Sequence, residues 1–404
     1  MLFTIAWRNI WRNKRRTLIV VSSVIIGVVA LIMNDSMSIG MIQQMFENQL
    51  GSHVAHIQIH KRGFNDNKII QSVVPDQRRV EEALRSTPEV KHFSRRVVTF
   101  GLVSSAVNSS GAAIIGVEHE REPNITIIKK SIIEGRYLSG ANHEVVIGRK
   151  MADKLSVEVG DKIVGMASTV SGTVGSDMFR VVGIFRTVSS EFDKSYVFIS
   201  LDNAQNMLEL GTDVSEFAVI LRNRELVEVV KSKIAERLGP DYEVLSYADL
   251  MPLILAQMQM YSESMFIVYI IIGLALIFGI INSTLMSVFE RMREFGVLMA
   301  IGMKNSRLFS MIMLEALVIG VLGTVVGMIV GLALYLPLSA YGIDLSMFSE
   351  SLTSFGVGST IYPVLTLQSV VGIMIVIPVF AVLGALYPAF KAIRLEPVSA
   401  IHYV

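Results

Sequence analysis

Long apolar runs, interrupted by one short charged segment, constrain this chain more than any other feature. Uncharged sequence extends from 264 to 289 and again from 316 to 343. A helix needs about 20 apolar residues to cross the hydrocarbon core of a bilayer, and both runs are long enough. With two further apolar runs, the sequence predicts four membrane-spanning helices. The predicted spans are roughly 18–33, 265–286, 310–335 and 370–387.

The composition agrees with a membrane protein that also carries a large soluble part. Hydrophobic residues make up 52% of the chain and charged residues only 18%, against about 25% charged residues in soluble domains. The formal net charge is +1, so no global field attracts nucleic acid, and no nucleic-acid partner is expected. The absence of cysteine excludes disulfides, thiolate metal sites and thiol nucleophiles.

The distribution of Lys and Arg orients the spans. Cations precede the first span, occupy the 287–307 loop and follow the fourth span, whereas the 337–368 loop contains no Lys or Arg. By the positive-inside rule, both termini are predicted to be cytoplasmic. The polar stretch from about 51 to 250 then lies outside, on the opposite side of the membrane from the termini.

Residues 1–16 are expected to form a cytoplasmic amphipathic helix. Trp7 and Trp11 recur there at helical spacing beside several cations, a pattern typical of helices in the membrane interface. A basic start followed by an apolar core also fits a cleaved signal peptide, but Ser36-Met37-Ser38 is a weak cleavage site. We therefore expect residues 17–50 to be a retained first span and its stalk.

A charged, helix-forming segment near 288–303 separates the second and third spans. A short amphipathic helix in this position can dock into a groove of a partner protein. We interpret it as the place where a membrane protein without its own motor receives mechanical work. The residues assigned to this coupling helix are Glu290, Arg291, Arg293, Glu294, Phe295 and Gly296.

The outer stretch 51–250 is predicted to be a mixed α/β domain. Two strand–helix units flank it, one within 54–86 and one within 216–245. A hairpin with strands at 97–107 and 112–117 is predicted around the turn Asn108-Ser109-Ser110-Gly111. Two such units suggest a ferredoxin-like part with a β-rich insertion from about 118 to 213.

Several separate stretches resemble one family of membrane proteins. Glu134-Gly135-Arg136-Tyr137, the segment 144–148 and Val159-Gly160-Asp161 look like the periplasmic core domain of MacB-like permeases. Residues 290–302, with Glu315 and the later glycines, resemble the FtsX-like permease domain, which would cover 251–404 with spans two to four. Tyr387-Pro388-Ala389, the segment 392–401 and Ala6-Trp7-Arg8-Asn9 are similar to the two ends of that family.

The resemblance implies a permease subunit of an ABC transporter, in the group of MacB, the lipoprotein-releasing (Lol-type) permeases and FtsX. Such permeases are dimeric, so a second copy or a sister permease is expected. The chain lacks the phosphate-binding sequence G-x-x-x-x-G-K-[ST]. We therefore expect no catalytic residue and no cofactor on it, and two partner ATPase subunits that bind ATP and Mg. The first span is preceded by a short segment, as in Lol-type permeases, whereas MacB carries a fused ATPase there.

Methionines at helical spacing suggest where cargo could bind. Because methionine is flexible and polarizable, a methionine-lined slot suits varied apolar ligands such as acyl chains, although such seams more often only pack two helices together. The predicted cargo is a lipoprotein or lipid-like molecule taken from the outer leaflet and passed to a periplasmic acceptor or adaptor. Because Arg293-Glu294-Phe295-Gly296-Val297 is nearer the MacB pattern, drug or peptide efflux and FtsX-like signalling to a cell-wall hydrolase remain alternatives. The candidate slot residues are Met33, Met37, Met41, Met45, Met258 and Met265.

Other residues in the third span are given structural roles. Gly323, Gly327 and Gly331 are spaced four apart and predict a helix-packing face. Glu315 is an acid within the span, and such residues are functional candidates by default. Because it follows Arg307 by only about two helical turns, we expect it to lie near the interface and accept a hydrogen bond from the loop.

His53, His56 and His60 could suggest a metal site. No acidic residue is spaced to complete one, and the H-E-x-x-H pattern is absent. We therefore expect no metal site and interpret the three histidines as part of a solvated strand edge.

Overall fold

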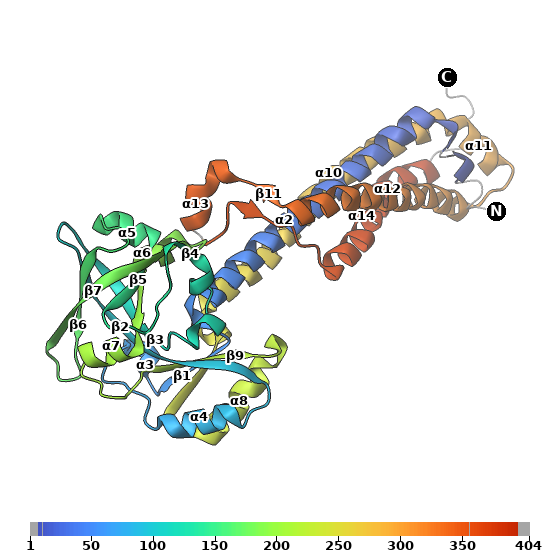
Figure 1. The fold of residues 1–404 in the computed structure, drawn as a ribbon. Helices are drawn as coiled ribbons and strands as arrows, with labels where there is room; N and C mark the ends of the chain where they lie inside the picture. The colour runs from blue at the N-terminus through green and yellow to red at the C-terminus, as the bar shows by residue number, and fades with distance from the viewer. Residues whose placement is uncertain (1–6, 10, 355, 395–404) are drawn as a thin grey trace. The chain divides into compact units, whose positions relative to one another are not determined.

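The computed structural model describes residues 7–9, 11–354 and 356–394, except for the side chains of Met258, Ser262, Glu350 and Ser354. The chain divides into two compact units (Figure 1). The helical unit contains residues 1–42, 257–344 and 360–404. The mixed α/β unit contains residues 43–256 and 345–359.

Four long helices build the helical unit. They are α2 (Lys14–Gln49), α10 (Pro252–Glu290), α12 (Asn305–Tyr341) and α14 (Leu367–Ile393). All four are long and apolar enough to cross a membrane, which confirms the four predicted spans. Their buried faces meet in one apolar core, where Val28 and Leu31 of α2 pack with Leu276, Met328 and Ile373 of the other three helices.

Short elements connect these helices. The helix α11 (Met292–Ala300) joins α10 to α12. Between α12 and α14, β11 (Ile343–Asp344) pairs with β12 (Thr360–Ile361). The segment between these two strands forms η5 (Ser346–Phe348) and α13 (Ser349–Ser354), which belong to the mixed α/β unit.

The mixed α/β unit begins with a four-stranded antiparallel sheet, in the order β10 (Tyr242–Ser246), β1 (Ile57–Lys61), β9 (Glu216–Leu221) and β2 (Val90–Ser104). When these four strands are numbered by their order in the chain, they lie across the sheet in the order 4-1-3-2. Two helices, α4 (Gln77–Arg85) and α8 (Val227–Leu238), connect the strands of each half. The topology confirms the predicted ferredoxin-like part.

The insertion forms a closed barrel. Around the circuit, β2 pairs with β3 (Ser109–Val117), then come β8 (Tyr196–Ser200), β5 (Glu144–Gly148), β7 (Val174–Phe185) and β6 (Lys162–Ser168), and β6 pairs back to β2. The short β4 (Ile132–Gly135) adds to β7. Because the circuit closes, these six strands leave no unpaired edge between them.

Several short helices cover the sheets. Serine side chains cap two of them, since Ser189 accepts a hydrogen bond from the amide of Phe192 and Ser200 accepts one from Asn203; hydroxyl caps satisfy amides at a helix start. These helices are η1 (Leu50–Val54), α3 (Phe64–Asn67), η2 (Glu122–Asn124), η3 (Ile128–Ser131), α5 (Arg149–Leu155), α6 (Ser190–Ser195), α7 (Leu201–Met207), η4 (Arg224–Leu226) and α9 (Tyr247–Leu250).

Two predicted strands differ in their bounds. The strand expected at 54–60 begins only at Ile57, because residues 50–54 form a π-helical turn that continues α2. The predicted hairpin exists, but its first strand starts at Val90 and ends at Ser104, three residues before the predicted end. Its turn is closed by the backbone amide of Ser105, which donates to the carbonyl of Asn108 at 2.8 Å.

Candidate functional site

The helix α11 is held against the helical unit by its apolar side. Phe295 is only 1% exposed and packs with Leu308 and Ile312 of α12 and with Ala389 of α14. Gly296 is also buried. These two residues were assigned to the partner contact, but their burial shows that they attach α11 to its own bundle.

A partly buried ion pair strengthens this attachment. Arg291, which is 8% exposed, donates through Nη1 to Oε1 of Glu315 at 3.0 Å, and its guanidinium lies 4.9 Å from the ring centre of Phe295. Glu315 also accepts from Nδ2 of Asn9 at 2.6 Å. Glu315 thus accepts from a loop donor, as the sequence predicts, and Arg291 points into the bundle rather than toward a partner.

The two acidic residues of the coupling segment bind the chain's own N-terminal segment. Arg12 donates to Glu294 at 2.7 Å, and Arg16 donates to Glu290 at 2.6 Å, with Asn13 adding a bond of 3.1 Å to Glu290. Although partial burial would raise the pKa of Glu294, hydrogen bonds from Arg12 and Arg291 outweigh burial and lower it. Sequence reasoning missed these contacts, because the partners lie more than 270 residues apart.

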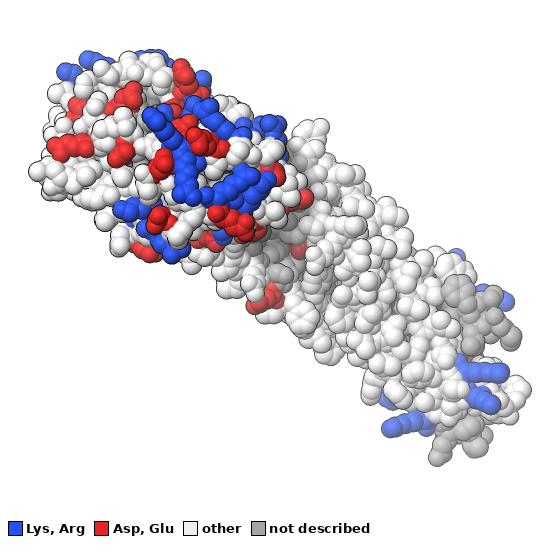
Figure 2. Space-filling model, turned by 90° about the horizontal axis from the view of Figure 1, so that it is seen from below, with Lys and Arg blue, Asp and Glu red and all other residues white. Residues whose placement is uncertain are grey.

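Two side chains of α11 and one from the turn after it are exposed and could contact a partner. Arg293 is exposed, Val297 is 43% exposed, and Ile301, in the turn that follows the helix, is 80% exposed. Figure 2 shows blue side chains gathered at one end of the helical unit and an almost uncharged surface along its length. An apolar patch with one cation, at the charged end of a membrane bundle, can dock a water-soluble partner.

The three glycines of α12 face α2 at close range. A Cβ atom on Gly323 would lie 2.6 Å from Val24, one on Gly327 would lie 2.8 Å from Val28, and one on Gly331 would lie 2.4 Å from Ile32. All three distances are shorter than a normal contact between carbon atoms. The missing side chains therefore set the distance between the two helices.

The methionine rows have mixed surroundings. Met33 packs on the shared core, and Met265 is 6% exposed and accepts a hydrogen bond from Asn34 at 3.3 Å. Met41 is 38% exposed, while Met37 and Met45 are partly exposed. The side chain of Met258 lies outside the described part of the structure. The first two methionines thus serve helix packing, and the cargo slot stays a prediction.

A lateral groove of about 510 Å³ separates α2 from α10. Ile19, Leu276 and Met286 are among its apolar lining residues, and Arg15, Arg16 and Glu290 are its charged ones. The groove follows residues 13–24 of α2, so it lies at the end of that helix away from the methionine row.

The three histidines lie in the mixed α/β unit, and the predicted solvated strand edge is wrong. Strand β1 is paired on both sides, by β10 and β9, so it is not an edge. His60 is 2% exposed, and its ring nitrogens lie 3.2 Å from the Ser215 carbonyl and 3.1 Å from Gln58. Burial lowers its pKa, although Glu216 opposes this shift. His56 accepts a backbone hydrogen bond, and burial followed by repulsion from Arg224 lowers its pKa.

Next to His60 lies a buried arginine that sequence reasoning did not single out. Arg96 is 2% exposed and donates to Glu122 at 2.6 Å, to Glu216 at 2.7 Å and to the His53 carbonyl at 2.6 Å. Burial alone would lower the pKa of Arg96, but the two carboxylates raise it above its ordinary value. The ion pairs of Arg96 with Glu216 and Glu122 connect strand β2 to β9 and to η2, so these residues have a structural role.

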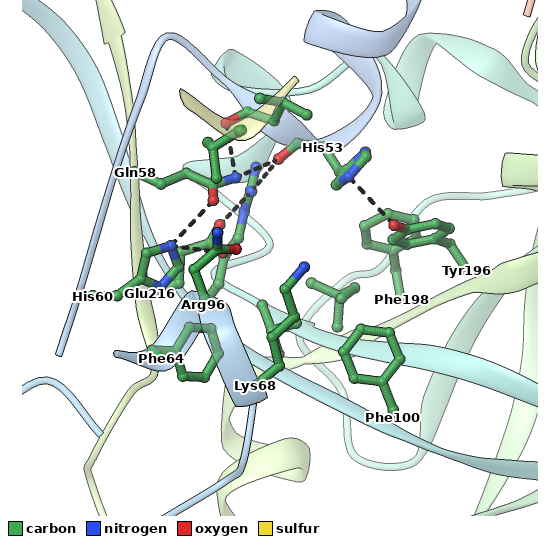
Figure 3. Close-up of a pocket in the computed structure, with 15 residues that line it drawn as sticks. His53, Gln58, His60, Phe64, Lys68, Arg96, Phe100, Tyr196, Phe198 and Glu216 are labelled. Atoms are coloured by element: carbon green, nitrogen blue, oxygen red, sulfur yellow. Dashed lines mark hydrogen bonds and ion pairs between the residues drawn. The ribbon is translucent and has the colours of Figure 1, made fainter. Parts of the chain in front are cut away.

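These groups line a small cavity of about 100 Å³ (Figure 3). Figure 3 shows Lys68 and Phe100 on the side of the cavity away from His53. Within the described ranges, no group of three or more His, Asp or Glu side chains could hold a metal ion. Arg96 and Glu216 of this cavity already bind each other, and we assign no reaction chemistry to it.

Four helices apolar enough to cross a membrane, a short helix between the second and third, and a ferredoxin-like unit carrying a barrel are the features of a membrane protein with a large domain outside the bilayer. Residues 17–237 match the MacB-like periplasmic core domain, and residues 265–397 match the FtsX-like permease C-terminal domain. The first match spans more than half of the chain. The chain therefore belongs to the MacB/FtsX-like family of ABC transporter permeases.

Named relatives fall in several groups. The lipoprotein-releasing system transmembrane protein LolC of Xylella fastidiosa is 22% identical over 305 residues, covering 72% of this chain and 73% of LolC. The pyoverdine export ATP-binding/permease protein PvdT of Pseudomonas syringae is 26% identical over 419 residues, which covers 98% of this chain but 58% of PvdT. The uncharacterized ABC transporter permease YvrN of Bacillus subtilis is 24% identical, with 99% and 98% coverage.

The solved periplasmic region of MacB from Actinobacillus actinomycetemcomitans aligns with 52% of this chain and 98% of its own length, at 16% identity and a TM-score of 0.37. The extracellular domain of the transporter YknZ aligns with 48% of this chain at 14% identity and a TM-score of 0.35.

Proposed function

We propose that this permease couples ATP hydrolysis in a partner protein to the extraction of lipoprotein or lipid-like cargo from the outer leaflet of the inner membrane. The observation that carries the proposal is the construction of α11. Its apolar side is fixed into the bundle by Phe295 and Arg291, while Arg293, Val297 and Ile301 stay exposed. A rigidly anchored helix with a free docking face can pass a push to the helices that hold it.

The anchoring contacts define where such a push would go. α11 follows α10 directly in the chain, and Arg12 and Arg16 connect its acidic residues to the start of α2. A displacement of α11 would therefore act on α2 and α10 together. These are also the two helices whose last and first turns, respectively, contribute to the mixed α/β unit.

The cargo assignment is supported by the surface of α2 at its end away from the N-terminus. Met41 is exposed there and Met37 and Met45 are partly exposed, and with cytoplasmic termini this end of the helix is the one on the outer side of the membrane. Flexible apolar walls suit acyl chains better than rigid polar substrates. The relation to LolC over 72% of the chain points in the same direction.

Efflux of a small amphipathic molecule is the second candidate. The relation to PvdT, an export ATP-binding/permease protein, covers 98% of this chain, which favours an exporter, and we propose a periplasmic adaptor as the partner in that case. In both cases we propose cytoplasmic termini, two ATPase subunits that bind ATP and Mg, and a second permease copy or sister permease. The chain itself would catalyse no reaction.

The proposal is tested by gentle extraction of the complex from native membranes, followed by mass spectrometry of the proteins and lipids that stay bound. An ATPase with acylated lipoproteins supports extraction, an ATPase with a periplasmic adaptor supports efflux, and an ATPase with a cell-wall hydrolase supports signalling. Loss of the ATPase in an Ile301→Asp variant, with normal retention in an Arg12→Gln variant, supports the assigned docking face. Recovery of the complex without any ATPase, under conditions where its other subunits stay associated, contradicts the proposal.

A further inference from the structure

The groove between α2 and α10 has a charged end and an uncharged end. Arg15, Arg16 and Glu290 line one end, whereas the lining residues at the other end, such as Leu276, carry no charge. On α10 the lining runs from Ala275 to Glu290, which at a rise of about 1.5 Å per residue is roughly 22 Å. One leaflet of a bilayer, head groups included, is about 20–22 Å thick. The groove therefore has the length of a single leaflet and carries its charges where the head groups lie.

One cation of this groove is free to bind an anion. Arg16 is already bound within the protein, since its Nη2 atom donates to Glu290 at 2.6 Å. Arg15 is exposed, and its side chain has no partner in the part of the chain that the structure describes. Two arginines and one glutamate give the groove a net charge of +1. The planar guanidinium of an unpaired arginine suits the oxygens of a phosphate group.

An unpaired amide lies further along the groove. Asn282 lines it, is exposed, and forms no side-chain hydrogen bond with another described residue. It precedes Glu290 by eight residues, so it lies roughly 12 Å deeper along α10. A polar group without a partner is costly in a membrane. An amide at this depth therefore favours a ligand that carries acceptor oxygens below its charged head, as the ester carbonyls of a phospholipid do.

The middle of the groove is open and apolar. Ile19 of α2 and Met286 of α10 are both exposed there. A Cβ atom on Gly279 would meet no other heavy atom within 4 Å, so this glycine leaves room between the two helices. The total volume of about 510 Å³ is apolar in this part, which suits an acyl chain.

We propose that this groove binds an anionic phospholipid of the cytoplasmic leaflet. Arg15 binds its phosphate, Asn282 donates to an ester carbonyl, and an acyl chain lies over Gly279. Basic pockets between membrane helices on the cytoplasmic side are known places for anionic lipid head groups. The choice of leaflet rests on the proposed cytoplasmic termini. This lipid is a resident ligand, distinct from the proposed cargo, which leaves from the opposite leaflet.

A helix of a second permease copy fits the groove less well. Such a helix would cross both leaflets, whereas the groove has the length of one, and an apolar helix would leave Arg15 without an anion. A bound phospholipid meets both requirements. It would also contact α2 and α10 beside the ion pair of Arg16 and Glu290, close to the start of α11.

The test uses the purified full-length permease with its ATPase partner, stripped of lipid in detergent, and native mass spectrometry to count bound molecules. The probes are phosphatidylglycerol, phosphatidylcholine with the same acyl chains, and glycerol phosphate, which has the anion without chains. Arg15→Gln is compared with Lys14→Gln, because Lys14 is the adjacent exposed cation and is not among the residues that line the groove. Gly279→Leu, which fills the groove, is compared with Gly372→Leu on α14, where an added Cβ also meets open space.

The native complex should bind phosphatidylglycerol about fivefold more tightly than phosphatidylcholine and should not retain glycerol phosphate. Arg15→Gln should remove this preference and Gly279→Leu should remove the bound lipid, while both control variants behave as the native protein does. Equal binding of the two lipids, or an unchanged preference in Arg15→Gln, overturns the inference.

Two further outcomes would also overturn it. Retention of glycerol phosphate as tightly as phosphatidylglycerol identifies a site for free phosphate. A changed number of permease copies in Gly279→Leu, without loss of lipid, identifies the groove as a subunit interface. Binding is measured without transport, so failure of the lipid site is distinct from failure of the proposed function, which would appear as loss of the ATPase from the native complex.

Discussion

The partly buried ion pair between Arg291 and Glu315 gives the sharpest prediction. The atoms of Arg291 and Glu315 are 3.0 Å apart, and their side chains are 9% and 14% exposed. At an effective dielectric constant of about 20, charges at that distance attract by about 5–6 kcal/mol. Removing one partner of a buried pair typically costs about 3–5 kcal/mol, because the other charge stays buried. In Glu315→Leu, Arg291 keeps its ion pair with Glu294 at 3.2 Å, so we expect a cost at the lower end of this range, and Asn9 also loses an acceptor.

The expected result is loss of coupling rather than loss of folding. A local cost of about 3 kcal/mol favours a detached α11 by roughly a hundredfold, so the cargo moved per ATP hydrolysed should fall at least tenfold. The measurement is transport and ATP hydrolysis in proteoliposomes that contain the partner ATPase. The double variant Arg291→Met with Glu315→Leu leaves no unpaired charge and should recover much of the coupling. Wild-type coupling in Glu315→Leu, or no recovery in the double variant, would refute the reasoning.

Three further outcomes are expected. Gly327→Ala places a Cβ atom 2.8 Å from a Cβ and 3.2 Å from a Cα atom of α2, which should destabilise the folded protein by about 1–3 kcal/mol. Gly331→Ala places its Cβ atom against the tip of the flexible Ile32 side chain, so it should lower the apparent unfolding temperature less than Gly327→Ala does. Burial raises the pKa of Asp193 to about 6 against hydrogen bonds from Thr187, so folding stability should increase as pH falls through 6 toward 4, by up to about 3 kcal/mol at about 1.4 kcal/mol per pKa unit. Asp193→Asn should therefore reduce the difference in unfolding temperature between pH 7.5 and pH 5, and an unchanged difference would contradict the shift. Cysteines at Ser190 and Thr353, whose hydroxyl oxygens lie 3.0 Å apart, should form a disulfide under mild oxidation, and failure of the pair to cross-link would contradict the contact between α13 and α6.

The sequence predicts those parts of the fold that depend on a local pattern of apolar and polar residues. The spans follow from hydropathy, because lipid excludes charge along about 20 residues at once. The ferredoxin-like part follows from two strand–helix units of ordinary length. The barrel closure could not be predicted in the same way, because it depends on β6 pairing with β2, two strands separated by about 60 residues.

The histidines show why burial is harder to predict than secondary structure. The segment around His60 reads as an alternating strand, but alternation does not reveal whether a strand lies at an edge or in the centre of a sheet. Strand β1 is central, and all its residues except Lys61 are buried. The buried His60 side chain is then satisfied by a partner from a distant segment, the Ser215 carbonyl, whereas Gln58 donates to the nearby Val54 carbonyl.

The candidate site was located by its position between two spans, yet the task of each residue could not be predicted. An amphipathic pattern identifies a polar and an apolar side, but it does not say which side faces the protein itself. Phe295 and Arg291 face inward, and the acids Glu290 and Glu294 are bound by the N-terminal segment. Only Arg293 of the assigned charged residues makes none of these contacts and stays exposed.

The pairing of the first and last strands has a mechanical consequence. β1 and β10 are antiparallel neighbours, with Ile57 opposite Ser246, so the chain enters and leaves the mixed α/β unit side by side. A force that separates these two ends would load the hydrogen bonds of the pair one after another, as in opening a zipper, whereas a force that moves both ends together loads none of them. The hydrogen bonds of this pair are therefore spared when α2 and α10 move together, and Phe46 and Leu50, at the end of α2 and just beyond it, pack with Met251, which directly precedes α10.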